Sequence, residues 1–245
     1  METTQELLSR LYLSLLDSDL DPQLTARLSC PLTLAVTPEW EASPTRLLIV
    51  GQETLEHGLF GDNALGIAPH DIRSFGELAS LPNRAEAIDR LVSVYRTSMT
   101  GEGTHENRPF WLAFNRLWRL PGFESALWSN MFWCSLDGGS VWNNSTSSEL
   151  LEISKMQRGR LRREIEVLKP TAVVFFTGPN YDVILKEEFE DAQLLGVSDL
   201  PKRGFARVSS QSLPEASFRL YHPKALRMQA HWEWLDTLEQ LLMAG

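Results

Sequence analysis

Residues 46–51 read RLLIVG, a short apolar run that ends at a glycine and opens a long polar loop. An apolar run of this length, bounded by turn-forming residues, is typical of a strand buried on both faces of a parallel sheet. Similar runs at 127–133 and 171–177 predict two more buried strands. Shorter runs at 205–209 and 217–221 are compatible with two further strands near the end of the chain.

Helical patterns alternate with these strands. Thr3 with Glu6, and Thr146 with Glu149, have the spacing of a capping box and predict two helix starts. The second of these helices should run to about residue 168, and other helices are expected over 84–98 and 109–118. A last helix should carry one apolar face, formed by Met228, Trp232, Leu235, Leu238 and Leu242.

Alternating strands and helices predict an α/β fold. We expect three layers, α/β/α, around a central and mainly parallel sheet of about four strands. Residues 1–245 should form a single domain, since this length is at the upper end for one domain and the lower end for two. In such folds the ligand crevice lies beyond the carboxyl ends of the strands.

The composition is that of a soluble globular protein, with 43% hydrophobic and 22% charged residues. No apolar run approaches the length that spans a bilayer, and the start of the chain has no secretory pattern. Cys30 and Cys134 are too few for a disulfide framework, a four-cysteine zinc site or an iron–sulfur cluster. We therefore expect a cytoplasmic protein without a metal or cofactor.

The net charge of −9 argues against a nucleic-acid partner, but the charges are unevenly distributed. The stretch 202–227 holds six basic residues against one acid, and 155–169 holds six against two. A basic face can bind a phosphate backbone even when the whole chain is acidic. For 155–169 the pattern favours a solvated face of an amphipathic helix.

Polar residues follow the predicted strands at 51–54, 129–130, 177–181 and 221–227. Taken singly, each of these segments is more simply explained as an ordinary polar loop or turn than as part of an active site. Taken together, they place a carboxylate, an amide and an imidazole around one crevice. Such a set suits the cleavage of a bond whose leaving group is an amide-like anion.

The order and spacing of these segments resemble the uracil-DNA glycosylase superfamily. GQETL at 51–55 resembles the family motif GQDPY, Asn130 resembles its strand-borne asparagine, and HPKALR at 222–227 resembles its closing motif HPSPLS. The resemblance spans about residues 46–228, although no motif is a full match. Branches with an iron–sulfur cluster are excluded, because two cysteines cannot ligate one.

The resemblance implies roles for four residues. Glu53 takes the place of the family aspartate that orients the attacking water and stabilises the sugar cation, on a side chain one methylene longer. His222 would donate a hydrogen bond to O2 of the departing base, and Gln52 would border the same oxygen. Asn130 would read the pyrimidine edge, but its amide can be turned to match either uracil or cytosine.

The closing motif implies contacts with DNA. Lys224 and Arg227 are candidate phosphate contacts, although Lys224 is also compatible with a solvated turn residue or a Schiff-base nucleophile. Leu226 stands where the family places the leucine that wedges into the base stack. It is equally well explained as the first apolar residue of the last helix.

The base pocket departs from the best-known branch of the family at Leu55, where that branch has a tyrosine that excludes a C5 methyl group. Without the tyrosine, and with a Gly-rich loop over 57–69, the resemblance implies a pocket that could admit a base enlarged at C5. Phe60 is a candidate stacking platform for the flipped base, although its offset from Glu53 does not match that branch.

One subgroup of the superfamily comprises bacterial anti-phage glycosylases that remove glucosylated hydroxymethylcytosine, and this sequence looks most like them. We therefore expect a monofunctional glycosylase that leaves an abasic site in double-stranded DNA after flipping the base, with no membrane or protein partner implied. Three alternatives stay open: a uracil-DNA glycosylase of base-excision repair, a non-catalytic module that binds modified bases, and an acidic interaction protein on an α/β scaffold.

Overall fold

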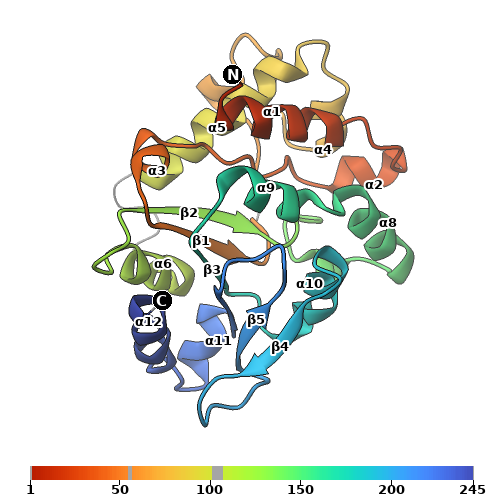
Figure 1. Cartoon of the computed structure of the whole chain (residues 1–245). Helices are drawn as coiled ribbons and strands as arrows, with labels where there is room; N and C mark the ends of the chain where they lie inside the picture. The colour runs from red at the N-terminus through yellow and green to blue at the C-terminus, as the bar shows by residue number, and fades with distance from the viewer. Residues whose placement is uncertain (1, 55–56, 101–106, 245) are drawn as a thin grey trace. The chain divides into compact units, whose positions relative to one another are not determined.

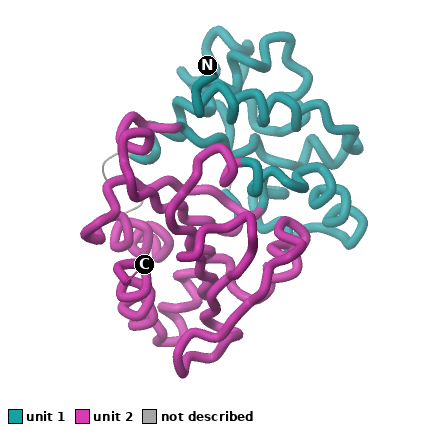
Figure 2. Tube along the Cα trace, viewed as in Figure 1, with its two compact units in different colours: residues 1–35, 53–101, 132–163 teal, residues 36–52, 102–131, 164–245 magenta. Residues whose placement is uncertain are grey.

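The structure is a computed structural model that describes residues 2–54, 57–100 and 107–244. It divides into two compact units (Figure 2), and each unit is assembled from three separate stretches of the chain. Unit 1 comprises residues 1–35, 53–101 and 132–163, and unit 2 comprises 36–52, 102–131 and 164–245. The expectation of a single domain over the whole chain stays a prediction.

Unit 2 is built on a six-stranded sheet with the strand order β2-β1-β3-β6-β5-β4 (Figure 1). Neighbours among β2, β1, β3 and β6 pair in parallel, whereas β5 pairs antiparallel with both β6 and β4. The strands are β1 (Arg46–Gly51), β2 (Ser125–Asn130), β3 (Ala172–Phe175), β4 (Gln193–Gly196), β5 (Phe205–Ser209) and β6 (Ala216–Leu220). The mixed α/β class and the mainly parallel sheet are thus confirmed.

The parallel strands form the core of unit 2. β1 lies between β2 and β3, and its residues Leu47 to Val50 have no exposed surface. This burial on both faces explains why the run is apolar without alternation. The helices of unit 2 are α3 (Pro38–Ala42), α6 (Pro109–Trp118), η2 (Pro179–Tyr181), α10 (Asp182–Glu188), α11 (Pro223–Met228) and α12 (Trp234–Ala244). Figure 1 shows α6, α11 and α12 on one side of the strands and α10 on the other.

Unit 1 is helical and packs around Trp133. The ring of Trp133 stacks on Tyr12 at 5.6 Å and meets the edge of Phe75 at 6.2 Å, while its indole N–H donates to the carbonyl of Leu32 at 2.7 Å. Its helices are α1 (Thr4–Leu15), α2 (Pro22–Arg27), η1 (Gly61–Asn63), α4 (Phe75–Ala79), α5 (Arg84–Thr100), α7 (Val141–Asn144) and α8 (Ser147–Gln157). Helix α9 (Arg160–Leu168) begins in unit 1 and ends in unit 2.

The sheet differs from the predicted one in two ways. It has six strands and not about four, because β4 and β5 extend it as an antiparallel hairpin. β4 was missed because it is an edge strand whose side chains are mostly exposed, so it has no apolar pattern. The second strand also begins and ends earlier than predicted, at 125–130, because the buried residues Met131 to Trp133 lie beyond the ladder.

Two predicted helices are each divided. The capping box at Thr146 is present, but the helix stops at Gln157 because Gly159 takes a left-handed conformation (φ +78°), and α9 follows. The last helix is divided into α11 and α12 around Ala230 (φ +56°), so Met228 and Trp232 do not share a helix with Leu235. The 155–169 run is also not wholly solvated, because Arg160 is buried. Among the described residues, no helix is long and apolar enough to cross a bilayer.

Candidate active site

The end of β1 and the end of β2 place Gly51 beside Asn130 in unit 2. The two residues are register partners in the parallel ladder. A Cβ atom added at Gly51 would lie 2.5 Å from Asn130 Oδ1, closer than real Cβ contacts allow. Gly51 is therefore required for the Asn130 side chain to lie where it does, and Asn130 itself is only 2% exposed.

The orientation of the Asn130 amide is set by Trp128. The indole N–H of Trp128 donates to Asn130 Oδ1 at 3.0 Å. Residues two apart on a strand lie on the same face, and an indole nitrogen can donate but never accept. The amide oxygen therefore faces Trp128, whose own ring packs edge-on against Trp111 at 5.0 Å.

Gln52 links the ends of two neighbouring strands. Its side-chain amide donates to the carbonyl of Thr177, just beyond β3, at 2.8 Å. The side chain is half-buried. Gln52 therefore ties the end of β1 to the loop after β3.

His222 is neutral and has a defined tautomer. It caps the N-terminus of α11, where its Nδ1 accepts from the backbone N–H of Lys224 at 3.2 Å. Burial, with a smaller contribution from the Lys224 charge, lowers the pKa of His222 to about 4. At neutral pH the ring therefore carries its one proton on Nε2, which makes Nε2 a hydrogen-bond donor.

Phe110 joins these residues into one site. Its ring stacks on His222 at 6.2 Å with an angle of 18°, and lies 6.1 Å from Trp128. A Cβ atom at Gly51 would lie 3.2 Å from the Phe110 ring, so this ring also borders the end of β1. Phe110 is half-buried, so part of this aromatic surface is accessible. Sequence reasoning missed Phe110, although an aromatic pair at the start of the predicted 109–118 helix was a usable signal.

The remaining predicted base-site residues lie in unit 1 or outside the described residues. Glu53 directly follows Gln52 and is half-buried, and it begins the 53–101 stretch that belongs to unit 1. Leu55 lies outside the described residues. The structure thus brings Asn130 and His222 together within unit 2, with Gln52 at the same edge of the sheet.

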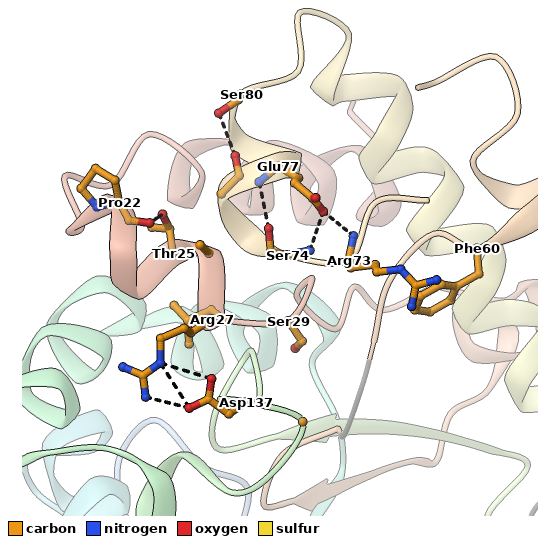
Figure 3. Close-up of a pocket in the computed structure, with 14 residues that line it drawn as sticks. Pro22, Thr25, Arg27, Ser29, Phe60, Arg73, Ser74, Glu77, Ser80 and Asp137 are labelled. Carbon is orange, nitrogen blue, oxygen red and sulfur yellow. Dashed lines mark hydrogen bonds and ion pairs between the residues drawn. The ribbon is translucent and has the colours of Figure 1, made fainter. Parts of the chain in front are cut away.

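Phe60 lies at a groove of about 1030 Å³ in unit 1 (Figure 3). The guanidinium of Arg73 lies over its ring, 5.1 Å from the centroid. Arg27 lines the same groove and is paired with Asp137 at 2.7 Å. Phe60 is therefore a partly exposed aromatic residue, but one face of its ring is covered by a cation.

The residues of the closing motif after His222 lie on α11, and their exposure contradicts one prediction. Lys224 and Arg227 are exposed on α11, as phosphate contacts require. Leu226 has no exposed surface, so it is a core residue and its prediction as the stacking wedge is wrong. Met228, two residues later, is 76% exposed and is the apolar side chain that α11 presents to solvent.

Comparison with known proteins adds no family to this geometry. Neither the scan of family models nor the search of curated proteins found a match for the chain. Within the described part of the chain, no group of three His, Cys, Asp or Glu side chains is placed to hold a metal ion. The functional argument therefore depends on the site residues themselves.

Proposed function

We propose that this chain is a DNA glycosylase that flips a modified pyrimidine out of double-stranded DNA and hydrolyses its N-glycosidic bond. The observation that carries the proposal is the set of Asn130, Phe110 and neutral His222 at one edge of the sheet. An oriented amide, an accessible aromatic face and a neutral imidazole donor are what a pocket for a flipped base needs. The proposal includes a three-layer, uracil-DNA glycosylase-like arrangement around the sheet.

His222 would stabilise the leaving group. As the bond between C1′ and the base breaks, the base keeps the electron pair and negative charge builds on its O2. The Nε2–H of His222 would donate to that oxygen without any prior loss of a proton. One preorganised donor of this kind typically lowers a barrier by roughly 3 kcal/mol.

Asn130 would read the edge of the base. With its oxygen held toward Trp128, the amide would turn its NH₂ end to an acceptor on the base. The acceptor is N3 in a cytosine and O4 in a uracil. Both the modified-cytosine proposal and its uracil alternative therefore fit Asn130, and other residues must decide between them.

Phe110 would form the wall against which the flipped base packs. Its ring packs against Trp128, which orients Asn130, and stacks on His222. A base held by Asn130 and His222 would therefore lie against this ring. Stacking on an aromatic side chain contributes about 1–3 kcal/mol per base. Phe60, whose ring is covered on one face by Arg73, is the weaker candidate for this role.

The preferred substrate would be a cytosine enlarged at C5, such as glucosylated hydroxymethylcytosine in phage DNA, which would make this an anti-phage defence enzyme. The support is the leucine at position 55 in place of a tyrosine, together with the general likeness. The alternatives are a uracil-DNA glycosylase of base-excision repair and a non-catalytic module that binds modified bases. A neutral donor at His222 favours catalysis over mere binding, because it acts on charge that develops only in the transition state.

The test is base release from matched duplexes that carry glucosylated hydroxymethylcytosine, hydroxymethylcytosine, cytosine or uracil, followed by alkaline cleavage at abasic sites. We expect release of the glucosylated base. Strand cleavage only at uracil would replace the preferred substrate with the repair alternative. Retained duplex binding with no release from any of the four would replace the enzyme with the binding module.

Glu53 supplies the matched inactive variant. Its carboxylate would orient the attacking water and stabilise positive charge at the sugar, and both effects matter mainly in the transition state. Glu53→Gln should therefore lower base release by at least roughly 100-fold, while duplex binding stays equal or becomes tighter. If Glu53→Gln kept wild-type turnover, the carboxylate that acts on the water would have to be another one.

A further inference from the structure

Arg219 is a buried arginine that the proposed chemistry does not use. It lies in β6, three residues before His222, and its side chain is 1% exposed. One side of its guanidinium pairs with Asp182 at the start of α10, with Nε 2.9 Å from Oδ1 and Nη2 3.0 Å from Oδ2. A buried guanidinium is costly unless it is fully paired, so its remaining partners matter.

The other side of the Arg219 guanidinium holds the loop between β4 and β5. Nη1 donates to the carbonyl of Arg203 at 2.7 Å, and Nη2 donates to the carbonyl of Lys202 at 3.2 Å. Because the loop is held by its backbone, the side chains of Lys202 and Arg203 are left exposed. The loop thus exposes two cationic side chains, while the hydrogen bonds from Arg219 fix its backbone conformation.

The same loop lies at the edge of the sheet that carries His222. The carbonyl of Gly204 accepts from the backbone N–H of Tyr221 at 3.0 Å, one residue before His222. A Cβ at Gly204 would lie 2.4 Å from the ring of Trp234 and 2.7 Å from that of Tyr221, so only glycine lets the loop pass there. In Figure 1 this loop follows the arrowhead of β4, and the pairing of Phe205 with Leu220 places its far end beside the last residue of β6.

The exposed charges at this edge of the sheet are mostly positive. Lys202 and Arg203 on the loop, and Lys224 and Arg227 on α11, are all exposed. The nearby carboxylate of Asp182 is paired with Arg219, which leaves Asp199 as the exposed acid of the loop. Cations on a preorganised backbone suit a polyanion, because little ordering cost is added when it binds.

We propose that the loop 201–204 is a second phosphodiester-binding site, which holds the DNA backbone beside the flipped nucleotide through Lys202 and Arg203. Arg219 is its positioning residue: it touches no DNA and sets the loop through the two carbonyls. This inference rests on the proposed function, since the ligand is the backbone of the same DNA. Backbone contacts position a protein without reading sequence, so the site is indifferent to which base is removed.

The test is the salt dependence of duplex binding, measured with the full chain and an unmodified labelled duplex. Each phosphate contact contributes about 0.9 to the slope of log affinity against log salt. The double variant Lys202→Ala/Arg203→Ala should lower that slope by about 1.8, which reduces the affinity loss between 50 and 200 mM salt by roughly tenfold. The matched control is Lys155→Ala/Arg158→Ala, which removes two exposed cations from unit 1 and should leave the slope unchanged.

A separate variant tests the positioning role. Arg219→Lys keeps the charge opposite Asp182 but lacks the planar fork that reaches both carbonyls. Well below its melting temperature, this variant should show a lower salt slope while Lys202 and Arg203 are still present. A merely structural role would lower the melting temperature and leave the slope of the folded protein as in wild type.

The inference and the proposed function fail in different measurements. Equal slopes for wild type and the Lys202/Arg203 variant would overturn the loop site, whichever base is released. Equal slope losses in both double variants would overturn it too, because the effect would then be one of net charge. Wild-type binding that does not change with salt would overturn the loop site together with every other phosphate contact. Base release, by contrast, tests only the glycosylase proposal.

Discussion

At the scale of single residues, the strand-end pattern predicted which side chains would lie at the edge of the sheet but not how they are oriented. Asn130 was expected on the second strand, but that strand was predicted over 127–133, and only the structure shows that Asn130 is the last residue of β2. The direction of its amide depends on a hydrogen bond from Trp128 and on the missing side chain of Gly51, which lies on another strand. Contacts between strands depend on register, which is why the sequence left both amide orientations open.

Replacing Trp128 with Phe should weaken base recognition. Phe keeps most of the ring packing but has no N–H, so Asn130 would lose the hydrogen bond that orients its amide, and either end of the amide could face the base. A hydrogen bond of this kind contributes about 1 kcal/mol, so base release should fall by roughly fivefold from every duplex on which the wild type acts.

The control for Trp128→Phe is Trp111→Phe, which removes an indole from the same aromatic cluster and leaves the hydrogen bond to Asn130 in place. Base release should stay at the wild-type rate in this control. Unchanged base release in Trp128→Phe would mean that the hydrogen bond from Trp128 does not orient the amide for base recognition.

At the scale of elements, local signals predicted helix starts better than helix ends. The capping boxes at Thr3 and Thr146 are both present, because a cap depends on residues three apart. The break between α11 and α12 has no glycine or proline, since Ala230 takes the left-handed conformation (φ +56°). The apolar spacing from Met228 to Leu242 continues across this break, so periodicity alone predicted one helix where there are two.

The division of the last helix changes which side chain of α11 can meet DNA. Leu226→Ala removes a fully buried side chain and should destabilise the fold by about 2–5 kcal/mol, lowering the melting temperature. Met228→Ala should change stability by less than about 0.5 kcal/mol, because Met228 is 76% exposed.

If Met228 supports the base stack after the flipped base leaves, Met228→Ala should lose base release from duplex DNA. It should keep base release from single strands, which have no stack to fill. If Met228→Ala changed base release from duplex and single-stranded DNA by the same factor, Met228 would not be the residue that fills the stack.

At the scale of the whole molecule, the sequence predicted the mainly parallel part of the sheet but neither its six strands nor the division into two units. The parallel core follows from apolar runs that are local in sequence. The units depend on which of the intervening stretches pack together, as when Trp133 packs against Tyr12 and Phe75 in unit 1. Such pairings join residues far apart in the chain, and no local pattern records them.

Among the described residues, each unit contains one histidine whose protonation opposes folding, so we expect stability to fall on acidification. Burial lowers the pKa of His57 in unit 1 and of His222 in unit 2 from 6.5 to about 4. Between pH 6.5 and 4 the unfolded chain binds these two protons and the folded chain does not. Stability should therefore be highest above pH 6.5 and should decrease as the pH falls to about 4.

Thermal melting over pH 4–8 measures this dependence, with His222→Gln as the test variant. Gln does not titrate, so the variant should lose part of the decrease between pH 6.5 and 4, while the contribution of His57 remains. A decrease as steep as that of wild type would mean that His222 is protonated in the folded protein at these pH values. In that case His222 would act as a cationic donor, and base release would fall as the pH rises through the true pKa of His222. With the pKa near 4, base release should instead show no loss from this residue as the pH rises from 5 to 8.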